Sequence, residues 1–114
     1  MNKTTGKLGE DIAAKYLQEQ GYTILERNKH FSKNCEIDII AKHKNTIVFV
    51  EVKTRTTTNF GQPLEAITPT KYQNIKTGVF TYLQENNIKT QNFRIDAVAI
   101  VLKPELDIKH IKNI

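Results

Sequence analysis

The chain has 114 residues, of which 39% are hydrophobic and 25% are charged, and these proportions are typical of a soluble globular protein whose residues 1–114 form one domain. The net charge of +5 favours an acidic partner, for which nucleic acid is the usual example. The single cysteine, Cys35, excludes an internal disulfide framework and fits a cytoplasmic protein, while the lack of a long apolar run argues against secretion or membrane insertion.

Residues 6–20 are predicted to form the first helix, which ends before Gly21. Gly6 and Gly9 lie on one stripe of this helix and cost about 1 kcal/mol each relative to alanine, so we expect the helix to pack closely on a sheet. Close packing brings Glu10 toward groups on the sheet. A solvated glutamate near the positive end of the helix explains Glu10 nearly as well.

Residues 22–31 alternate loosely between apolar and polar side chains, which predicts a first strand antiparallel to residues 36–42. The far end of this strand is basic and includes Arg27 and Lys29. Two interpretations of these charges are equally good at this point: a rim that contacts phosphates, or a solvated turn.

Two apolar runs rich in β-branched residues, 37–41 and 47–52, flank a polar segment and predict a β-hairpin. We expect its turn to be centred on Lys44-Asn45. Residues whose numbers sum to 89 then face each other, because antiparallel pairing keeps this sum constant.

This register has a chemical consequence for four charged residues. It places Asp38 opposite Glu51, and Glu36 opposite Lys53, with Cβ atoms about 5 Å apart. Two adjacent carboxylates repel, so one of them takes up a proton or the pair holds a cation. Carboxylate oxygens suit Mg²⁺ or Mn²⁺, and Lys53 on the same face is placed to contact a phosphate or to help activate a water.

A plainer interpretation is a surface hairpin whose charges face solvent. Ile40, Ile47 and Phe49 share the charged face, however, and the opposite face is also apolar. Strands that are apolar on both faces are typically buried on both sides. We therefore favour a functional role for the charged residues.

The remainder of the chain is predicted to complete an α/β unit. Residues 54–63 form a polar loop that begins beside Lys53, and its Arg55 is a suitable phosphate ligand. A second helix is capped by Thr68-Pro69, ends near Asn86-Asn87, and carries Lys71 away from its apolar stripe.

Residues 93–101 form an apolar strand, and the strand–helix–strand order predicts that it is parallel to residues 47–52. Arg94 and Asp96 then lie at the far end of the sheet from the carboxylate pair, so we expect them to form a structural pair. Residues 103–114 are predicted to form an edge strand or a loosely ordered end. The three histidines are scattered and form no predicted ligand set.

Asp38 followed by Glu51-Val52-Lys53 resembles the D…(D/E)-x-K motif of the PD-(D/E)XK nuclease superfamily, with Ile37 where proline is usual. Most of the chain also resembles the bacterial YraN family, which is related to archaeal Holliday-junction resolvases. The segments that carry this second resemblance are G-K-L-G-E-D at 6–11, Y-L at 16–17, R-N at 27–28, E-I-D-I-I-A at 36–41, V-F-V-E-V-K-T-R at 48–55 and F-G-Q-P-L-E-A at 60–66.

The resemblance implies a restriction-endonuclease-like core, in agreement with our own expectation of one α/β domain with a mixed sheet of four to five strands flanked by two helices. It also implies that Glu10 and the Val52 carbonyl join Asp38 and Glu51 at a metal site, and that a homodimer acts on branched or junction DNA. We therefore expect a Mg²⁺- or Mn²⁺-dependent endonuclease that hydrolyses DNA. Its catalytic residues are Asp38, Glu51, Lys53 and Glu10, and its DNA contacts are Arg55, Lys53, Arg27, Lys29 and Lys71.

Two other functions remain open. One is a non-catalytic nucleic-acid-binding module of nuclease fold, and the other is a protein–protein adaptor with a structural ion cluster. The set of three acids and a lysine favours an enzyme, because carboxylates repel phosphate and hinder a module that only binds. A lack of affinity for DNA or RNA at low salt would favour the adaptor.

Overall fold

The computed structural model describes residues 3–32, 35–59, 61–63, 67–88 and 92–114. Its elements are, in chain order, α1 (Lys3–Glu19), β1 (Thr23–Ser32), β2 (Cys35–His43), β3 (Thr46–Arg55), α2 (Pro69–Glu85), β4 (Phe93–Val101) and β5 (Asp107–Ile111). The strands form one sheet in the order β1-β2-β3-β4-β5, antiparallel except for the parallel pair β3 and β4. The expected α/β fold with a mixed sheet and two helices is confirmed. Of the 60–66 motif, residues 60 and 64–66 lie outside the described residues.

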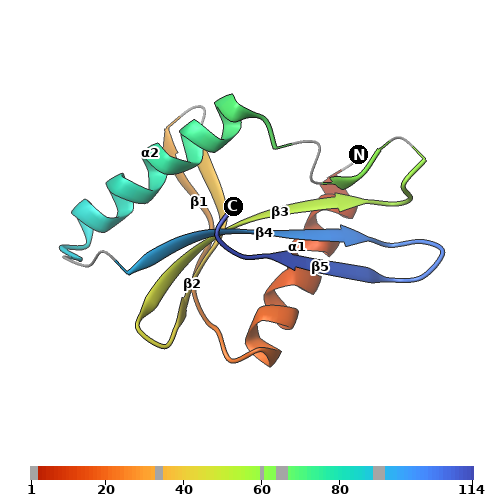
Figure 1. Ribbon diagram of the computed structural model, residues 1–114, viewed down its shortest axis with the longest axis horizontal. Coiled ribbons are helices and arrows are strands. Elements are labelled where there is room, and N and C mark those ends of the chain that lie inside the picture. The colour runs from red at the N-terminus through yellow and green to blue at the C-terminus, as the bar shows by residue number, and fades with distance from the viewer. Residues whose placement is uncertain (1–2, 33–34, 60, 64–66, 89–91) are drawn as a thin grey trace.

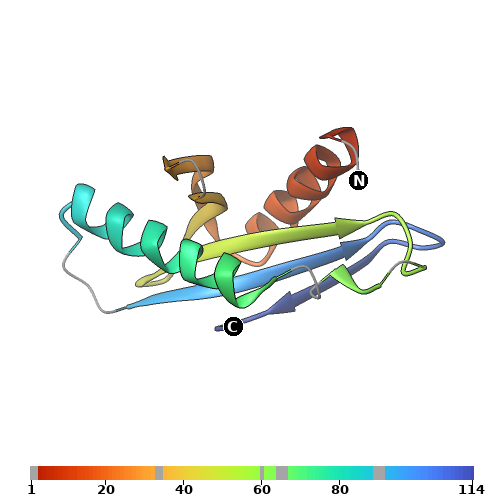
Figure 2. The ribbon, with the colours of Figure 1, turned by 90° about the horizontal axis from the view of Figure 1, so that it is seen from above.

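The two helices bury separate cores on the two faces of the sheet. Leu17 of α1 packs in one core with Val50 of β3, and Val79 of α2 packs in the other core with Phe49 of the same strand. Since Phe49 and Val50 are neighbours along the strand, their side chains point to opposite faces. Figure 1 shows α2 beside β1 and β2, with α1 behind the other strands. In Figure 2, β1 and β2 curl out of the plane of β3, β4 and β5.

The hairpin of β2 and β3 has the predicted turn and the predicted register. Only Lys44 and Asn45 separate the two strands, and Lys44 has a φ of 56°. The ladder runs from the pair of His43 and Thr46 to the pair of Ile39 and Val50. Each pair sums to 89, as expected.

The ladder ends one pair before Asp38 and Glu51, so the expected direct pairing of these two acids is not formed. Beyond this point the Asp38 side chain takes the place of a backbone partner for β3: its Oδ2 accepts a hydrogen bond of 2.8 Å from the Val52 backbone N–H. A continued ladder would have paired Val52 with Ile37. Ile37 instead packs in the α2 core, whereas Ile39 packs in the α1 core, so β2 turns between these two residues.

The expected pair of Glu36 and Lys53 is wrong. Both residues are described, and Glu36 pairs in register with His30 of β1, with His30 Nε2 3.6 Å from Glu36 Oε1. Lys53 Nζ lies 3.2 Å from Glu51 Oε1 instead. The reason is the turn of β2 between Ile37 and Ile39, because it moves Glu36 away from β3.

The second half of the chain follows the sequence prediction closely. Thr68 caps α2 by accepting a hydrogen bond of 3.1 Å from the Lys71 N–H, and Asn86 caps its other end. The crossover makes β3 and β4 parallel. The predicted edge strand is β5, which is antiparallel to β4.

Two helical glycines allow the helices to approach the sheet closely. A methyl group at Gly9 of α1 would overlap the side chain of Thr54, and one at Gly78 of α2 would lie 2.7 Å from Cys35 Sγ. The expectation of close packing is therefore confirmed at Gly9. It does not explain Gly6, because no atom lies within 4 Å of a methyl group placed there. In the described part of the chain, no helix is long and apolar enough to span a membrane.

Candidate metal and nucleic-acid site

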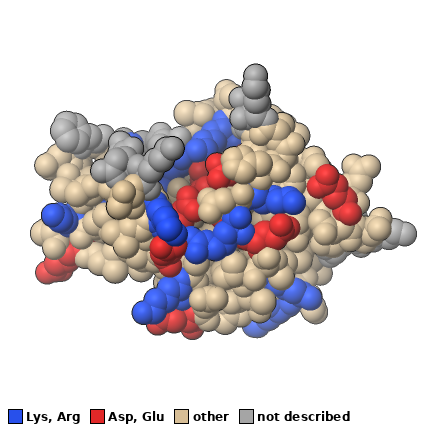
Figure 3. Space-filling view, turned by 180° about the vertical axis from the view of Figure 1, so that it is seen from behind, with Lys and Arg blue, Asp and Glu red and all other residues tan. Residues whose placement is uncertain are grey.

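Charged side chains of both signs gather on the face shown in Figure 3. Acidic side chains lie near the middle of this face, and lysine and arginine side chains lie on several sides of them. Such an arrangement suits a centre that holds a cation within a surface that attracts a polyanion.

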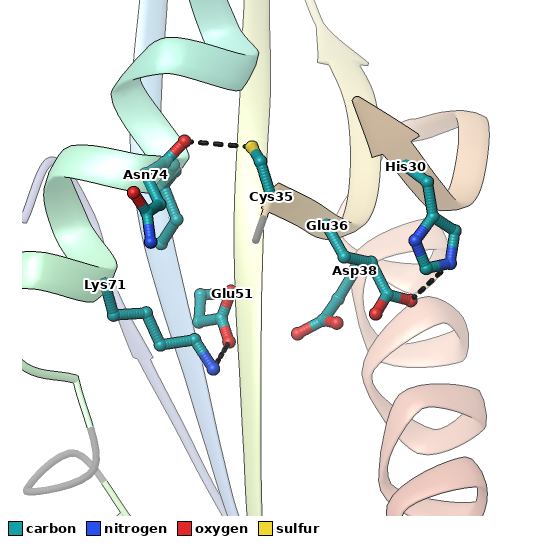
Figure 4. Close-up of a pocket in the computed structure, with 8 residues that line it drawn as sticks. His30, Cys35, Glu36, Asp38, Glu51, Lys71 and Asn74 are labelled. Carbon is teal, nitrogen blue, oxygen red and sulfur yellow. Dashed lines mark hydrogen bonds and ion pairs between the residues drawn. The ribbon is translucent and has the colours of Figure 1, made fainter. Parts of the chain in front are cut away.

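A hollow of about 250 Å³ lies between α2 and the turned part of β2. Figure 4 shows that acidic side chains from β2 and β3 and a lysine from α2 converge there. The residues that line the hollow are His30, Cys35, Glu36, Asp38, Glu51, Lys71, Asn74 and Ile75. Asp38 and Glu51, two of the three acids predicted to form the site, therefore share one hollow.

Asp38 is held in an environment that disfavours its charge. Burial and the nearby Glu51 carboxylate raise the pKa of Asp38 from 3.8 to about 8, against the opposing effect of the hydrogen bond from Val52. A carboxyl group with such a pKa carries a proton at neutral pH. The proton occupies a place that a metal ion can take, because a cation compensates the same charge.

Glu51 is the most deeply buried acid of the hollow, with a side chain only 3% exposed. Two ammonium groups contact its Oε1: Lys53 Nζ at 3.2 Å and Lys71 Nζ at 3.0 Å. Burial lowers the pKa of Lys53, and the nearby Lys71 lowers it further. A lysine of lowered pKa is better suited to proton transfer than an exposed one.

The backbone of Val52 adds an oxygen at this place. In a strand, the N–H and C=O groups of one residue point to the same neighbouring strand. The Val52 N–H points to Asp38 of β2, so its carbonyl points toward β2 as well. Two carboxylates and a carbonyl form a set of hard oxygen donors, which fits Mg²⁺ or Mn²⁺ completed by water and phosphate oxygens.

Glu10 of α1 lies beside this hollow rather than in it. It lines an adjoining hollow with Arg27 and Asn28, and the two hollows share His30 and Glu36 as lining residues. Burial raises the pKa of Glu10, a hydrogen bond with Asn28 opposes this rise, and the Glu10 charge contributes to the raised pKa of Asp38. Among the described residues, no three His, Cys, Asp or Glu side chains are grouped closely enough to hold a metal ion.

The predicted DNA contacts are arranged in two groups. Lys53 and Lys71 contact Glu51 directly, as described above. Arg27 lies 2.7 Å from Asp11 and Lys29 lies 3.7 Å from Glu26, so on β1 these cations are paired with acids at the surface. Arg55 ends β3 at the loop that follows Lys53.

The contact between Lys71 and Glu51 was missed by sequence reasoning, which placed Lys71 off the apolar stripe of its helix and named it only as a DNA contact. The Thr68-Pro69 cap fixes the start of α2, but the angle of α2 across the sheet depends on contacts with β2, such as the hydrogen bond of 2.9 Å from Cys35 Sγ to the Asn74 carbonyl. These contacts join residues far apart in sequence. No local sequence pattern predicts such long-range contacts.

A second polar cluster lies on the α1 side of the sheet. Asp96 is fully buried and receives two hydrogen bonds from Arg94, of 2.8 and 3.1 Å, and one of 3.0 Å from the Asn113 N–H. His110 Nε2 lies 2.7 Å from Asp96 Oδ2, and His110 Nδ1 lies 3.2 Å from the Tyr16 hydroxyl. The role of His110 was missed.

The expected pairing of Arg94 and Asp96 is confirmed. The expectation that they lie at the far end of the sheet is wrong: Asp96 pairs in register with Val50, the residue before Glu51. Asp96 is separated from the carboxylate pair because it lies on the α1 face of the sheet.

Comparisons with known proteins identify the family of this domain. The model of "Uncharacterised protein family UPF0102" matches residues 9–100. A UPF0102 protein of Caldanaerobacter subterraneus subsp. tengcongensis is 47% identical over 97% of this chain and 93% of its own length. UPF0102 proteins of Syntrophus aciditrophicus and Syntrophomonas wolfei are 49% and 42% identical, over 91% and 99% of this chain and 81% and 98% of their own lengths. The resemblance to the YraN family is thereby confirmed. The chain belongs to the uncharacterised protein family UPF0102.

Proposed function

We propose that the protein is a metal-dependent endonuclease that hydrolyses phosphodiester bonds in DNA. The observation that carries this proposal is the buried pair of Asp38 and Glu51 in one hollow, with Lys53 Nζ 3.2 Å from Glu51. The Glu51 carboxylate disfavours the charge of Asp38, so the proximity of the two acids costs free energy. Groups held at such a cost are typical of functional sites.

Asp38 and Glu51 would hold one or two Mg²⁺ or Mn²⁺ ions, with the Val52 carbonyl beside them. A bound divalent ion supplies a water of lowered pKa and neutralises charge on the scissile phosphate. The chain's own residues set the geometry: the hydrogen bond from Val52 fixes the Asp38 carboxyl, and Lys53 and Lys71 fix that of Glu51. Lys53 orients the attacking water or stabilises negative charge that develops on the phosphate.

DNA is the proposed polymer because the net charge is +5 and basic side chains flank the acidic centre. By the resemblance to resolvases, the proposal extends to branched or junction DNA, to a homodimer and to a cytoplasmic protein. The place of Glu10 in an adjoining hollow is compatible with a supporting role through its charge on Asp38.

The test is a cleavage assay on duplex, flap, junction and single-stranded DNA with Mg²⁺ or Mn²⁺. We expect the parent protein to cleave at least one substrate, and Asp38→Asn and Glu51→Gln to abolish cleavage. Both variants should bind DNA as tightly as the parent or more tightly, because they remove negative charge that meets phosphate. Glu105→Gln, which changes an exposed acid, should leave both properties unchanged.

The other two functions give different results in the same assay. A parent protein that binds DNA but cleaves no substrate would be a nucleic-acid-binding module. A parent that neither cleaves nor binds DNA or RNA at low salt would be an adaptor. Cleavage that survives both acid substitutions, in protein free of contaminating nuclease, would overturn the assignment of these residues.

A further inference from the structure

Lys71 occupies a fixed position at the start of α2. Its backbone N–H donates a hydrogen bond of 3.1 Å to Thr68 Oγ1, and Pro69 holds the first position of the helix. The next residue, Tyr72, donates a hydrogen bond of 3.0 Å from its hydroxyl to the Ile114 carbonyl. The turn that carries Lys71 is thus anchored on two sides, which fixes the backbone position from which its side chain reaches Glu51 (Figure 4).

Lys71 and Lys53 contact the same oxygen of Glu51. A carboxylate oxygen offers about two lone-pair directions, and two ammonium groups use both of them. A divalent ion that binds Glu51 Oε1 therefore has to displace one ammonium group. Two lysines left beside that ion would also repel it.

The two lysines differ in how easily they can leave. The Lys53 side chain is 18% exposed and belongs to the same strand as Glu51, two residues further along. The Lys71 side chain is 37% exposed and comes from another element across the hollow. Lys71, the more exposed of the two, can therefore move toward solvent more easily than Lys53.

We propose that Lys71 is a placeholder cation: it holds Glu51 in the metal-free protein and moves to a DNA phosphate when the metal binds. The proposal rests on the proposed metal site and adds a regulation to it. Metal alone binds weakly because it competes with Lys71, and DNA strengthens metal binding because it gives the displaced ammonium group a new partner. Coupling of this kind is reciprocal, so the metal strengthens DNA binding by the same factor.

The experiment measures Mn²⁺ binding to the DNA-free protein by isothermal titration calorimetry. We expect Lys71→Gln to bind Mn²⁺ more tightly than the parent by about tenfold, which lies within the usual range of coupling between sites. Lys71→Met, which keeps the apolar stem, should show the same gain. Lys76→Gln is the matched control, because Lys76 belongs to the same helix but lies over the Tyr72 ring, 5.8 Å from its centroid.

The outcomes separate this inference from the proposed function. If Asp38→Asn abolishes Mn²⁺ binding while Lys71→Gln and Lys71→Met bind Mn²⁺ no more tightly than Lys76→Gln, the placeholder role is wrong and the metal site stands. If Lys76→Gln gained as much Mn²⁺ affinity as Lys71→Gln, the gain would be explained by net charge alone, and the placeholder role of Lys71 would be wrong. Absence of Mn²⁺ binding to the parent and to both Lys71 variants would overturn the metal site together with this inference.

Discussion

Two aspartates of this domain are buried in opposite ways. Asp96, on the α1 side of the sheet, is fully buried, and all of its neighbours named above favour its charge: Arg94, His110 and the Asn113 N–H. Although burial opposes ionisation, the hydrogen bonds from His110 and Arg94 lower the pKa of Asp96 below 3.8. Asp38, in the hollow beside α2, has its pKa raised to about 8 by burial and by Glu51.

The difference separates a structural acid from one that we propose to be functional. Asp96 joins β4 to the C-terminal segment, and its hydrogen bonds offset the cost of burying a charge. Asp38 accepts one hydrogen bond among the described residues and faces another acid that repels it. In the described part of the chain, no cation forms an ion pair with Asp38, so a bound metal ion could compensate its charge. This is the physical basis for the proposed metal site.

The largest expected effect concerns stability. Asp96→Ala should lower the free energy of unfolding by about 3 kcal/mol, because it leaves the partly buried Arg94 without its partner. Asp38→Asn should leave stability unchanged or raise it, since it removes a repelled acid but keeps an acceptor for Val52. Urea unfolding measures both. Asp107→Ala, at an exposed position of β5, is the control and should stay within about 0.5 kcal/mol of the parent. If Asp38→Asn lowered the free energy of unfolding as much as Asp96→Ala does, the proposed difference between the two aspartates would be contradicted.

The pH dependence of stability should have opposite signs for the two acids. The folded pKa of Asp38 is raised above 3.8, so its contribution is complete below 3.8 and is lost as the pH rises toward about 8. Relative to Asp38→Asn, the parent should become steadily less stable as the pH rises through this window. The folded pKa of Asp96 is lowered, so its contribution is lost only as the pH falls below 3.8. Urea unfolding across this pH range tests both signs, and parallel curves for the parent and Asp38→Asn would contradict the account.

The next effect concerns DNA. Lys53→Ala should stop cleavage and weaken DNA binding modestly, with a salt dependence shallower by about one unit of slope, because one phosphate contact is lost. Fluorescence anisotropy at several salt concentrations measures this slope. Lys109→Ala removes the same charge from an exposed position of β5, outside the hollow, and should leave cleavage intact. If Lys53→Ala and Lys109→Ala had the same cleavage activity and the same salt dependence of DNA binding, Lys53 would contribute only its net charge.

The smallest effect is expected for Glu10→Gln. Glu10 acts on Asp38 through its charge from the adjoining hollow, so the substitution should lower the pKa of Asp38 slightly and reduce cleavage less than Asp38→Asn does. Cleavage rates of the two variants under the same conditions give the comparison. A loss equal to that of Asp38→Asn would place Glu10 among the metal ligands, as the family resemblance implies.

The sequence predicted the parts of the fold that depend on local rules. The two-residue turn at Lys44-Asn45 determined the register of the hairpin, and the crossover determined that β3 and β4 are parallel. The hairpin register brings Asp38 and Glu51 together in one hollow. Asp96 pairs with Val50 of β3 and belongs to a separate cluster because it lies on the opposite face of the sheet.

The errors and omissions arose where contacts distant in sequence prevail over local pattern. Glu36 was paired with Lys53 because nothing in residues 36–41 shows that the ladder stops at Ile39. The contact of Lys71 with Glu51 depends on the packing of α2, and the place of His110 depends on the pairing of β5 with β4. Alternation in 107–111 gave a weak signal for that strand, but it did not identify Asp96 as the partner of His110.

The central claim is that Asp38 and Glu51 form a pair of acids that requires a cation. The most direct test is a titration of the Asp38 carboxyl carbon by NMR, with and without Mg²⁺. We expect a pKa of about 8 in the metal-free protein, a lower pKa in Glu51→Gln, and a marked fall of the pKa in the parent on addition of Mg²⁺. A carboxyl group that titrates near 3.8 and does not respond to Mg²⁺ would contradict the account.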